Sequence, residues 1–265
     1  MGDSKHHQKR LASPLAYPME RKTNKFTFHA EPGPRSIQEG IPLGLILREM
    51  LRHASNLKEL KFILNRKHVF VDQKPRTSPR FVVGPQDVLS IPGIHEHYRL
   101  IHWVGRRGLK LVQIPEEDSN WKLVSIVDKT TVRGGHIQLN LDDGRNILLR
   151  KDAVSDEDPF TDPATFATRG TLKIELPSQK ILEYFPFELD SYALITSGTN
   201  TGLHGFLRYT EKRVGKNRSV AIIESGEDQI ITAMENVFII GKDAPEVPVF
   251  QPEDEGSEVE EEEES

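Results

Sequence analysis

The side chains with the clearest chemistry in this sequence are Lys and Arg residues gathered on one face of a short segment. Lys58, Lys61, Arg66 and Lys67 fall opposite the leucines of residues 56–67. Ammonium and guanidinium groups pair with phosphate oxygens, and phosphate neutralisation supplies most of the affinity of a protein for nucleic acid. The pattern therefore predicts a basic surface that binds a polyanion.

Residues that could hold a metal ion occur in three places, and none of these has a complete ligand set. His6 and His7 are adjacent without a third partner, and His95 and His97 are a pair on an expected strand without a third ligand. The carboxylates of residues 152–163 lack the Asp-x-Asp-x-Asp-Gly order of a calcium loop. The sequence also lacks a phosphate loop, a Gly-x-Ser-x-Gly elbow and a His-Glu-x-x-His run. We therefore assign no catalytic residue, metal ligand or cofactor.

Charge is strongly segregated along the chain, although the net charge is only −5. Residues 1–80 contain 16 Lys or Arg and 7 Asp or Glu, whereas residues 243–265 contain 11 acidic residues and no Lys or Arg. A basic front half with an acidic tail is typical of a protein that binds nucleic acid at one end. The tail itself should stay disordered and repel RNA.

Length and composition indicate several small modules rather than one large core. Of the 265 residues, 36% are hydrophobic and 28% are charged. This hydrophobic fraction is low for a single core in a chain of this length. No stretch approaches the roughly 18 apolar residues of a membrane helix, and the N-terminus lacks an apolar signal segment. With no cysteine, disulfides and thiolate chemistry are excluded, and a reducing cytoplasm is the expected compartment.

Two short helices should position the basic residues. Arg48 and Arg52 fall off the apolar stripe of the first helix, and Asn56 followed by Glu59 is a capping-box signature for the second. The stripe of the first helix is Leu43, Leu47, Met50 and Leu51, and that of the second is Leu57, Leu60, Ile63 and Leu64.

The rest of the chain carries strand and turn signals. Gly105 to Gly108 reads as a basic hairpin turn that contains Arg106 and Arg107. Strands are predicted at residues 69–71, 88–91, 98–103, 109–114, 121–127, 137–141, 146–149, 171–176, 180–185 and 193–195. After the last of these, Gly198, Gly202 and Gly205 allow positive φ and close backbone approach. Residues 1–41, by contrast, form an irregular basic arm that should order only on a partner.

The order of elements in residues 42–91 resembles the alpha-L RNA-binding fold, the small module first described in a bacterial small-subunit ribosomal protein. The match covers both helices, the Val69–Asp72 strand and the stretch from Gly84 to Ile91. Two departures occur, because that fold often has glycine between the second helix and the strand and Asn-Gly in the turn. Here Lys67-His68 and Asp72-Gln73 stand at those places.

The glycine loop after residue 195 resembles a KOW motif, a segment of SH3-like barrels. With both modules in order, residues 5–242 resemble the S4e family of archaeal and eukaryotic small-subunit ribosomal proteins. The acidic tail departs from this family, whose members more often end in basic residues. The resemblance implies an α+β multi-module fold with a basic arm (1–41), an alpha-L domain (42–104), a β-rich central domain (105–181), a KOW barrel (182–242) and an acidic tail (243–265).

The implied function is that of a structural constituent of the small ribosomal subunit in the cytoplasm, without catalysis. Its partners would be ribosomal RNA and neighbouring ribosomal proteins, with no membrane and no small-molecule substrate. The predicted RNA-binding residues are Lys5, Lys9, Arg10, Arg48, Arg52, Lys58, Lys61, Arg66, Lys67, Lys74, Arg76, Arg80, Arg106 and Arg107.

Two other functions would also use an alpha-L or KOW module. Alpha-L modules precede pseudouridine synthase domains, which need an Arg-Leu-Asp-type context on a large α/β scaffold. Here Leu141-Asp142 follows Asn140, and the region after Ile91 is rich in strands and short. An elongation-type factor that binds polymerase through the KOW barrel would leave the basic arm without a role. Stoichiometric incorporation into ribosomal subunits would separate these alternatives from the ribosomal function.

Overall fold

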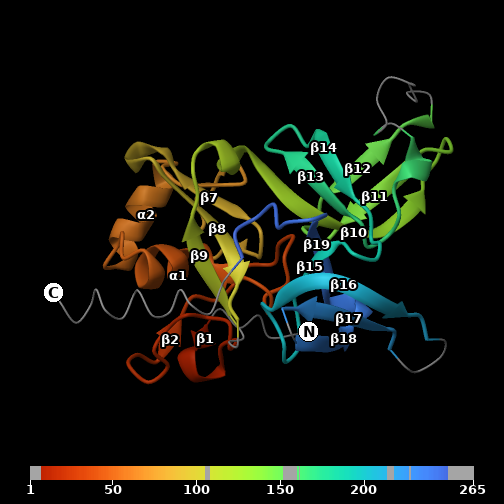
Figure 1. Ribbon diagram of the computed structural model, residues 1–265. Helices are drawn as coiled ribbons and strands as arrows, with labels where there is room; N and C mark the ends of the chain where they lie inside the picture. The colour runs from red at the N-terminus through yellow and green to blue at the C-terminus, as the bar shows by residue number, and fades with distance from the viewer. Residues whose placement is uncertain are drawn as a thin grey trace, which may run out of the picture.

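A computed structural model describes residues 7–104, 108–151, 160, 162–213, 218–226 and 228–249. Within these residues, three five-stranded antiparallel sheets follow one another along the chain, with two short helices beside the first (Figure 1). The expected mixture of few helices and many strands is thus confirmed. In the same residues, no helix has the length and apolar character needed to cross a membrane.

The first sheet has the strand order β5-β4-β7-β8-β9. Its strands are β4 (Phe70–Val71), β5 (Lys74–Pro75), β7 (Val88–Ile91), β8 (Glu96–His102) and β9 (Leu109–Gln113). Because β9 pairs with β8 from Tyr98 to His102, this sheet extends beyond the predicted boundary at residue 104. The two helices lie beside it and share its core, which includes Leu47, Leu60 and Leu89.

The predicted capping box forms at the start of α2 (Leu57–Asn65). The Asn56 side-chain oxygen accepts hydrogen bonds from the N–H groups of Lys58 (2.9 Å) and Glu59 (3.0 Å). The Glu59 carboxylate in turn accepts the Ser55 N–H at 2.9 Å. One predicted core contact is wrong: Leu57, in the first helical turn, is 44% exposed.

The first predicted helix is shorter and less regular than its leucine spacing indicates. An α-helical turn, α1 (Leu43–Leu45), passes into a π-helical segment, Ile46–Met50. This segment ends at Met50, and Arg52, two residues later, has a left-handed φ of 56°. Leu43 and Leu47 are buried as predicted. In the described residues, the remaining short helices are 3₁₀ turns at Arg10–Ala12, Pro92–Ile94, Glu117–Asn120, Pro163–Thr165 and Met234–Asn236.

The described part of the N-terminal arm is ordered without a partner. Strand β1 (Gln8–Lys9) pairs with β2 (Phe26–Thr27), and β3 (Ile41–Pro42) pairs with β6 (Val82–Val83). Tyr17 is buried in the core of the first sheet, with Met19 and Phe28 packed against it. These three side chains supply the apolar surface that the proline-rich composition seemed to lack. For residues 7–41, the prediction of order only on a partner is therefore wrong.

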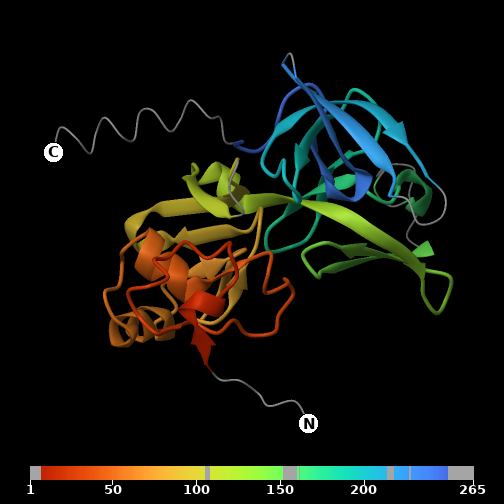
Figure 2. The ribbon, with the colours of Figure 1, turned by 90° about the horizontal axis from the view of Figure 1, so that it is seen from below.

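The central sheet is organised by one long strand, β10 (Trp121–Thr131) (Figure 2). Its first half pairs with β13 (Thr171–Glu175) and its second half with β11 (Ile137–Leu141). Strands β12 (Asn146–Leu149) and β14 (Ile181–Phe185) complete the order β12-β11-β10-β13-β14. Both predicted hairpins, β11–β12 and β13–β14, are present.

The third sheet has the order β18-β17-β16-β15-β19. Its strands are β15 (Tyr192–Ile195), β16 (His204–Glu211), β17 (Val220–Ser225), β18 (Asp228–Ala233) and β19 (Val237–Gly241). After β19, Val247 is still buried against this sheet, and Glu246 meets Lys173 at 2.8 Å. The start of the predicted acidic tail is therefore packed. Residues 250–265 lie outside the described part.

The three predicted loop glycines serve two different purposes. Gly198 (φ 102°) and Gly202 (φ 90°) have left-handed backbones, and a Cβ on Gly202 would lie 2.8 Å from the backbone nitrogen of Val104. Gly205 does not have positive φ. Its Cβ would instead lie 2.0 Å from the carbonyl oxygen of Glu224 on the paired strand β17. Close approach rather than positive φ therefore requires glycine at position 205.

Candidate nucleic-acid interface

The basic face predicted on α2 is present and open to solvent. Lys58, Lys61, Arg66 and Lys67 are all exposed, while Leu60 and Leu64 on the opposite side are fully buried. The apolar stripe thus anchors the helix, and the same geometry turns its cations outward. The structure brings these four predicted residues together on one short element.

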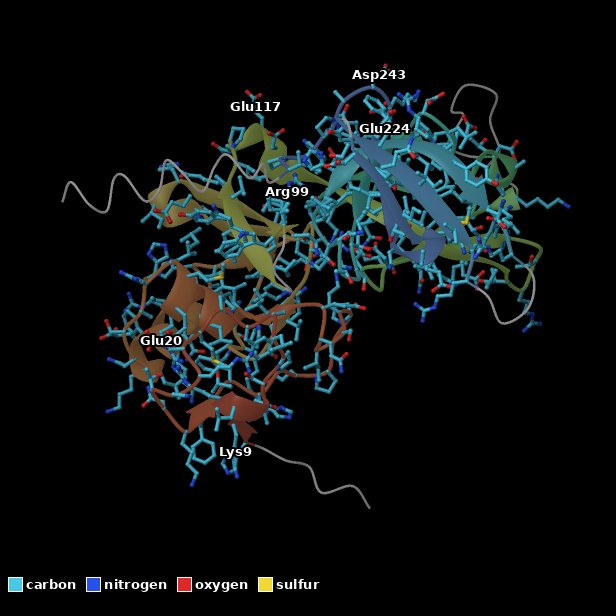
Figure 3. The ribbon with its side chains drawn as sticks, turned by 60° about the horizontal axis from the view of Figure 1, so that its bottom comes forward. Lys9, Glu20, Arg99, Glu117, Glu224 and Asp243 are labelled. Atoms are coloured by element: carbon cyan, nitrogen blue, oxygen red, sulfur yellow. The ribbon has the colours of Figure 1, made fainter. Side chains whose placement is uncertain are left out.

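Lys9, Arg52 and Lys74 are exposed elsewhere on the first module. Lys9 lies at the end of the molecule formed by the β1–β2 hairpin, remote from Glu224 of the third sheet (Figure 3). Three further predicted residues, Lys5, Arg106 and Arg107, lie outside the described part of the chain, as do His6 and most of the acidic loop at 152–163.

Arg10 is not available to phosphate, because its side chain is only 5% exposed. Its guanidinium donates to the Glu20 carbonyl (2.6 Å), the Thr23 hydroxyl (2.9 Å) and the Phe26 carbonyl (3.4 Å). It also pairs with Glu49 at 3.2 Å. Arg10 therefore ties the N-terminal hairpin to the first helix, and we leave it out of the candidate surface.

Three more predicted arginines are half-buried and have partners within the protein. Arg48 pairs with Glu49 at 2.7 Å. Arg76 lies 4.1 Å from the centroid of the Phe81 ring. Arg80 donates to the carbonyl of His29 at 2.8 Å. These contacts stabilise the module and reduce what the three arginines can offer to a phosphate.

The histidine pair at 95–97 is separated by its surroundings. His97 is buried and its Nδ1 lies 3.0 Å from the Ser90 hydroxyl, whereas His95 is exposed. Across the part of the chain that the structure covers, no group of three or more metal-ligating side chains occurs.

A buried ionic network, which the sequence did not reveal, joins the first and central sheets. The Lys122 ammonium on β10 lies 2.7 Å from Asp72, 3.0 Å from Asp87 and 2.7 Å from Asp143. Arg145 pairs with Asp72 at 2.6 Å and with Asp143 at 3.1 Å. The partners come from turns distant in sequence, so no local spacing could have indicated the network.

Arg35 extends this network to the N-terminal segment. Its guanidinium lies 3.4 Å from Asp87 and 3.2 Å from Asp142. Burial raises the pKa of the Asp87 carboxyl, but Lys122 and Arg35 outweigh this effect and lower it to about 2. Burial likewise lowers the pKa of Lys122, and the surrounding carboxylates more than reverse that effect and raise it. The Asp87 carboxylate and the Lys122 ammonium are thus charged at neutral pH.

Arg99 makes a second contact between the two sheets. It points from β8 toward the start of β10 (Figure 3), where it donates to the carbonyls of Asp118 (2.8 Å) and Trp121 (3.0 Å). Its guanidinium also lies 4.5 Å from the Trp121 ring centroid. The basic helix is therefore carried by a first module that is firmly attached to the central one.

A cleft of about 1110 Å³ lies between the N-terminal segment and the third sheet and has a different character. Its lining includes the exposed apolar side chains of Leu15, Ile37 and Val127, together with Glu39 and Glu235. Arg35 also contributes to the lining, but it is buried and paired with carboxylates. This cleft is therefore unsuited to phosphate.

The architecture is that of a ribosomal protein. It matches the crystal structure of the 30S ribosomal protein S4e from Thermoplasma acidophilum with a TM-score of 0.60 and 27% sequence identity, over 76% of this chain and 94% of that one. The family described as Ribosomal family S4e matches residues 94–181, and the RS4NT (NUC023) domain matches residues 1–38.

Sequence relatives cover nearly the whole chain. The small ribosomal subunit protein eS4 of Methanothermobacter thermautotrophicus is 39% identical over 91% of this chain and 94% of its own length. The eS4 protein of Metallosphaera sedula is 37% identical over 92% of this chain and 99% of its own length. The chain belongs to the S4e family of ribosomal proteins, which confirms the resemblance found in its sequence.

Proposed function

We propose that this chain is a structural constituent of the small ribosomal subunit, located in the cytoplasm, where it binds ribosomal RNA. The observation that carries the RNA contact is the exposed cluster of Lys58 and Lys61 on α2 with Arg66 and Lys67 directly after it. Four cations within ten residues, backed by a buried leucine stripe, suit a run of phosphates. Lys9, Arg52 and Lys74 are further exposed cations elsewhere on the same module.

The modules have proposed identities. Helix α2, the strands after it and the two-residue turn at Asp72–Gln73 support an alpha-L module. The five antiparallel strands β15–β19, with Gly198 and Gly202 at positive φ, support a KOW barrel. The role is structural, as membership of a ribosomal protein family implies. A pseudouridine-synthase-like enzyme is not favoured, because the relatives are ribosomal proteins over nearly their full length.

Neighbouring ribosomal proteins are the second class of partner. The cleft lined by Leu15, Ile37 and Val127 combines apolar side chains with the carboxylates of Glu39 and Glu235. This combination repels phosphate and complements a Lys- or Arg-rich protein segment that carries a few apolar residues. We assign that cleft to such a segment.

The RNA assignment is tested by the salt dependence of binding. Replacing Lys58, Lys61 and Arg66 together with alanine should weaken binding to small-subunit ribosomal RNA. Each lost phosphate contact should also reduce the slope of log K against log salt by about 0.7–0.9.

A matched variant removes the same charge elsewhere, with alanine at Lys151, Lys180 and Lys242, which are exposed on or beside the other two sheets. It should change the slope much less. An unchanged slope in the α2 variant, or equal losses in both variants, would remove α2 from the interface.

A further inference from the structure

An exposed aromatic ring on α2 is not accounted for by the core or by phosphate binding. Phe62 is 56% exposed, although Leu60 and Leu64 on the same helix are fully buried. α2 lies at the outer side of the first module (Figure 1). A ring left in water at the centre of a basic face has apolar area that only a ligand or partner could cover.

The surroundings of the ring differ on its two sides. One turn toward the C-terminus, the Arg66 guanidinium lies 4.0 Å from the ring centroid, a cation–π contact that holds both side chains in place. Toward the N-terminus, the ring borders an open hollow of about 470 Å³, also lined by His53, Lys58, Glu59 and Ile63. Phe62 therefore stands between a guanidinium and an open hollow that is large enough to admit a nucleobase.

The one carboxylate that lines the hollow, Glu59, keeps its negative charge but is held within the helix cap. Both Glu59 oxygens are already used by the helix cap, one by the Ser55 N–H (2.9 Å) and one by the Asn56 amide (2.8 Å). His53 is held at its Nε2 by Glu96 at 2.9 Å. Lys58, which is exposed, is the one Lys or Arg among the residues that line the hollow.

We propose that this hollow binds one unpaired RNA base, which stacks on Phe62 while Lys58 contacts the adjoining phosphate. The inference rests on the proposed RNA-binding function and adds its ligand class, a single-stranded or bulged nucleotide. Proteins recognise unpaired RNA by stacking bases on aromatic rings and guanidinium planes, and a base inside a duplex is not accessible in this way.

A protein partner fits this position less well than a base does. To cover Phe62, an apolar partner surface would also have to cover Lys58, Lys61 and Arg66, and desolvating three unpaired cations is costly. Phosphates on either side of a stacked base would neutralise the same cations. The charge around the ring therefore favours a nucleotide.

The test uses the full chain and two probes, a single-stranded RNA of about 12 nucleotides with one 2-aminopurine and a blunt duplex of the same length. In Phe62→Leu, affinity for the single strand should fall about 5- to 150-fold, the range given by losing one base stack. The salt slope should not change, because no charge is lost. Affinity for the duplex should stay within twofold, and quenching of 2-aminopurine should be lost.

Two variants serve as controls. Phe62→Tyr keeps the ring and should bind the single strand like the unmodified chain. Leu57→Ala removes exposed apolar area from the same helix, where Leu57 is 44% exposed, and should leave both affinities within twofold.

The possible outcomes separate failure of this inference from failure of the proposed function. If Phe62→Leu binds both probes normally while the Lys58, Lys61 and Arg66 variant loses affinity, RNA binding stands and the stacking site is overturned. The stacking site is also overturned if Phe62→Leu loses affinity equally for the single strand and for the duplex. Normal RNA binding with reduced incorporation into subunits would assign Phe62 to a protein contact instead. If the unmodified chain binds neither ribosomal RNA nor the probes, the proposed function itself fails.

Discussion

Replacing Lys122 with methionine removes the ammonium group that joins three buried carboxylates. The Lys122 side chain is 1% exposed, and its Nζ lies within 3.0 Å of Asp72, Asp87 and Asp143. Methionine has a similar length and no charge, so the substitution isolates the electrostatic contribution. The variant leaves these carboxylates with the guanidiniums of Arg35 and Arg145 alone.

Removing one partner of a buried ion pair typically costs about 3–5 kcal/mol, because the remaining charge is left without compensation. We expect a loss of this size at pH 7, a large part of the roughly 5–15 kcal/mol that stabilises a folded protein. The loss should shrink in acid. Because the Asp87 pKa is lowered to about 2 in the folded protein, its stabilising contribution is present above about pH 4 and disappears as pH falls toward 2.

Urea unfolding, followed by circular dichroism and tryptophan fluorescence, measures this loss. The matched control is Lys173→Met, since Lys173 makes a more exposed pair with Glu246 at 2.8 Å and such pairs contribute about 0–1 kcal/mol. Because the Lys122 network joins the first and central sheets, the Lys122 variant should also unfold in two separate transitions. A loss below about 1 kcal/mol for Lys122→Met, equal to that of the control, would refute the argument.

Three further predictions concern other parts of the structure. Gln73 has a φ of 60° in a two-residue hairpin turn, so Gln73→Gly should raise the free energy of unfolding by about 1 kcal/mol in urea melts; no gain would contradict this. Gly205→Ala should lower the free energy of unfolding by about 1–3 kcal/mol, because the new Cβ would lie 2.0 Å from the carbonyl oxygen of Glu224. Gly93→Ala should leave it nearly unchanged, because a Cβ at Gly93 would have no other atom within 4 Å. Burial, with Arg35 adding to it, lowers the pKa of His102 to about 4, so its neutral form is favoured in the folded state and stability should rise between about pH 4 and 6.5. His102→Gln should flatten that part of the pH profile, and an unaltered profile would exclude His102 as the group responsible.

The features that the sequence predicted well depend on neighbours a few residues apart. The capping box from Asn56 to Glu59 and the hairpins of the central sheet are of this kind, and the structure has all of them. The Lys122 network could not be found in this way, because its paired members are separated by up to 107 residues. The sequence also predicted a hairpin turn at residues 105–108, but the proposed boundary at residue 104 assigned β9 to the central domain, whereas β9 pairs with β8 in the first sheet.

The two departures from the alpha-L pattern show why the type of a residue alone is a poor predictor of turn conformation. Lys67, Asp72 and Gln73 stand where that fold often has glycine or Asn-Gly, and all three have φ between 51° and 60°. Each non-glycine residue in this region costs of order 1 kcal/mol or more. Asp72 offsets its cost through its bonds to Lys122 and Arg145, so the turn keeps its shape because the network needs that carboxylate there.

The same reasoning explains which predicted phosphate ligands remain available. Among the candidates within the described residues, each lysine is exposed: Lys9, Lys58, Lys61, Lys67 and Lys74. The four that are buried or half-buried are arginines: Arg10, Arg48, Arg76 and Arg80. A guanidinium has five donors in a planar fork and is more weakly hydrated than an ammonium, so it can satisfy several internal acceptors at once, as Arg10 does. An ammonium is strongly hydrated, and Lys122 is buried only because three carboxylates surround it. Counting Lys and Arg as equivalent therefore overestimated the number of cations available to RNA in the N-terminal segment. The exposed lysines, with Arg52 and Arg66, support our proposal that α2 is the centre of the RNA-binding surface.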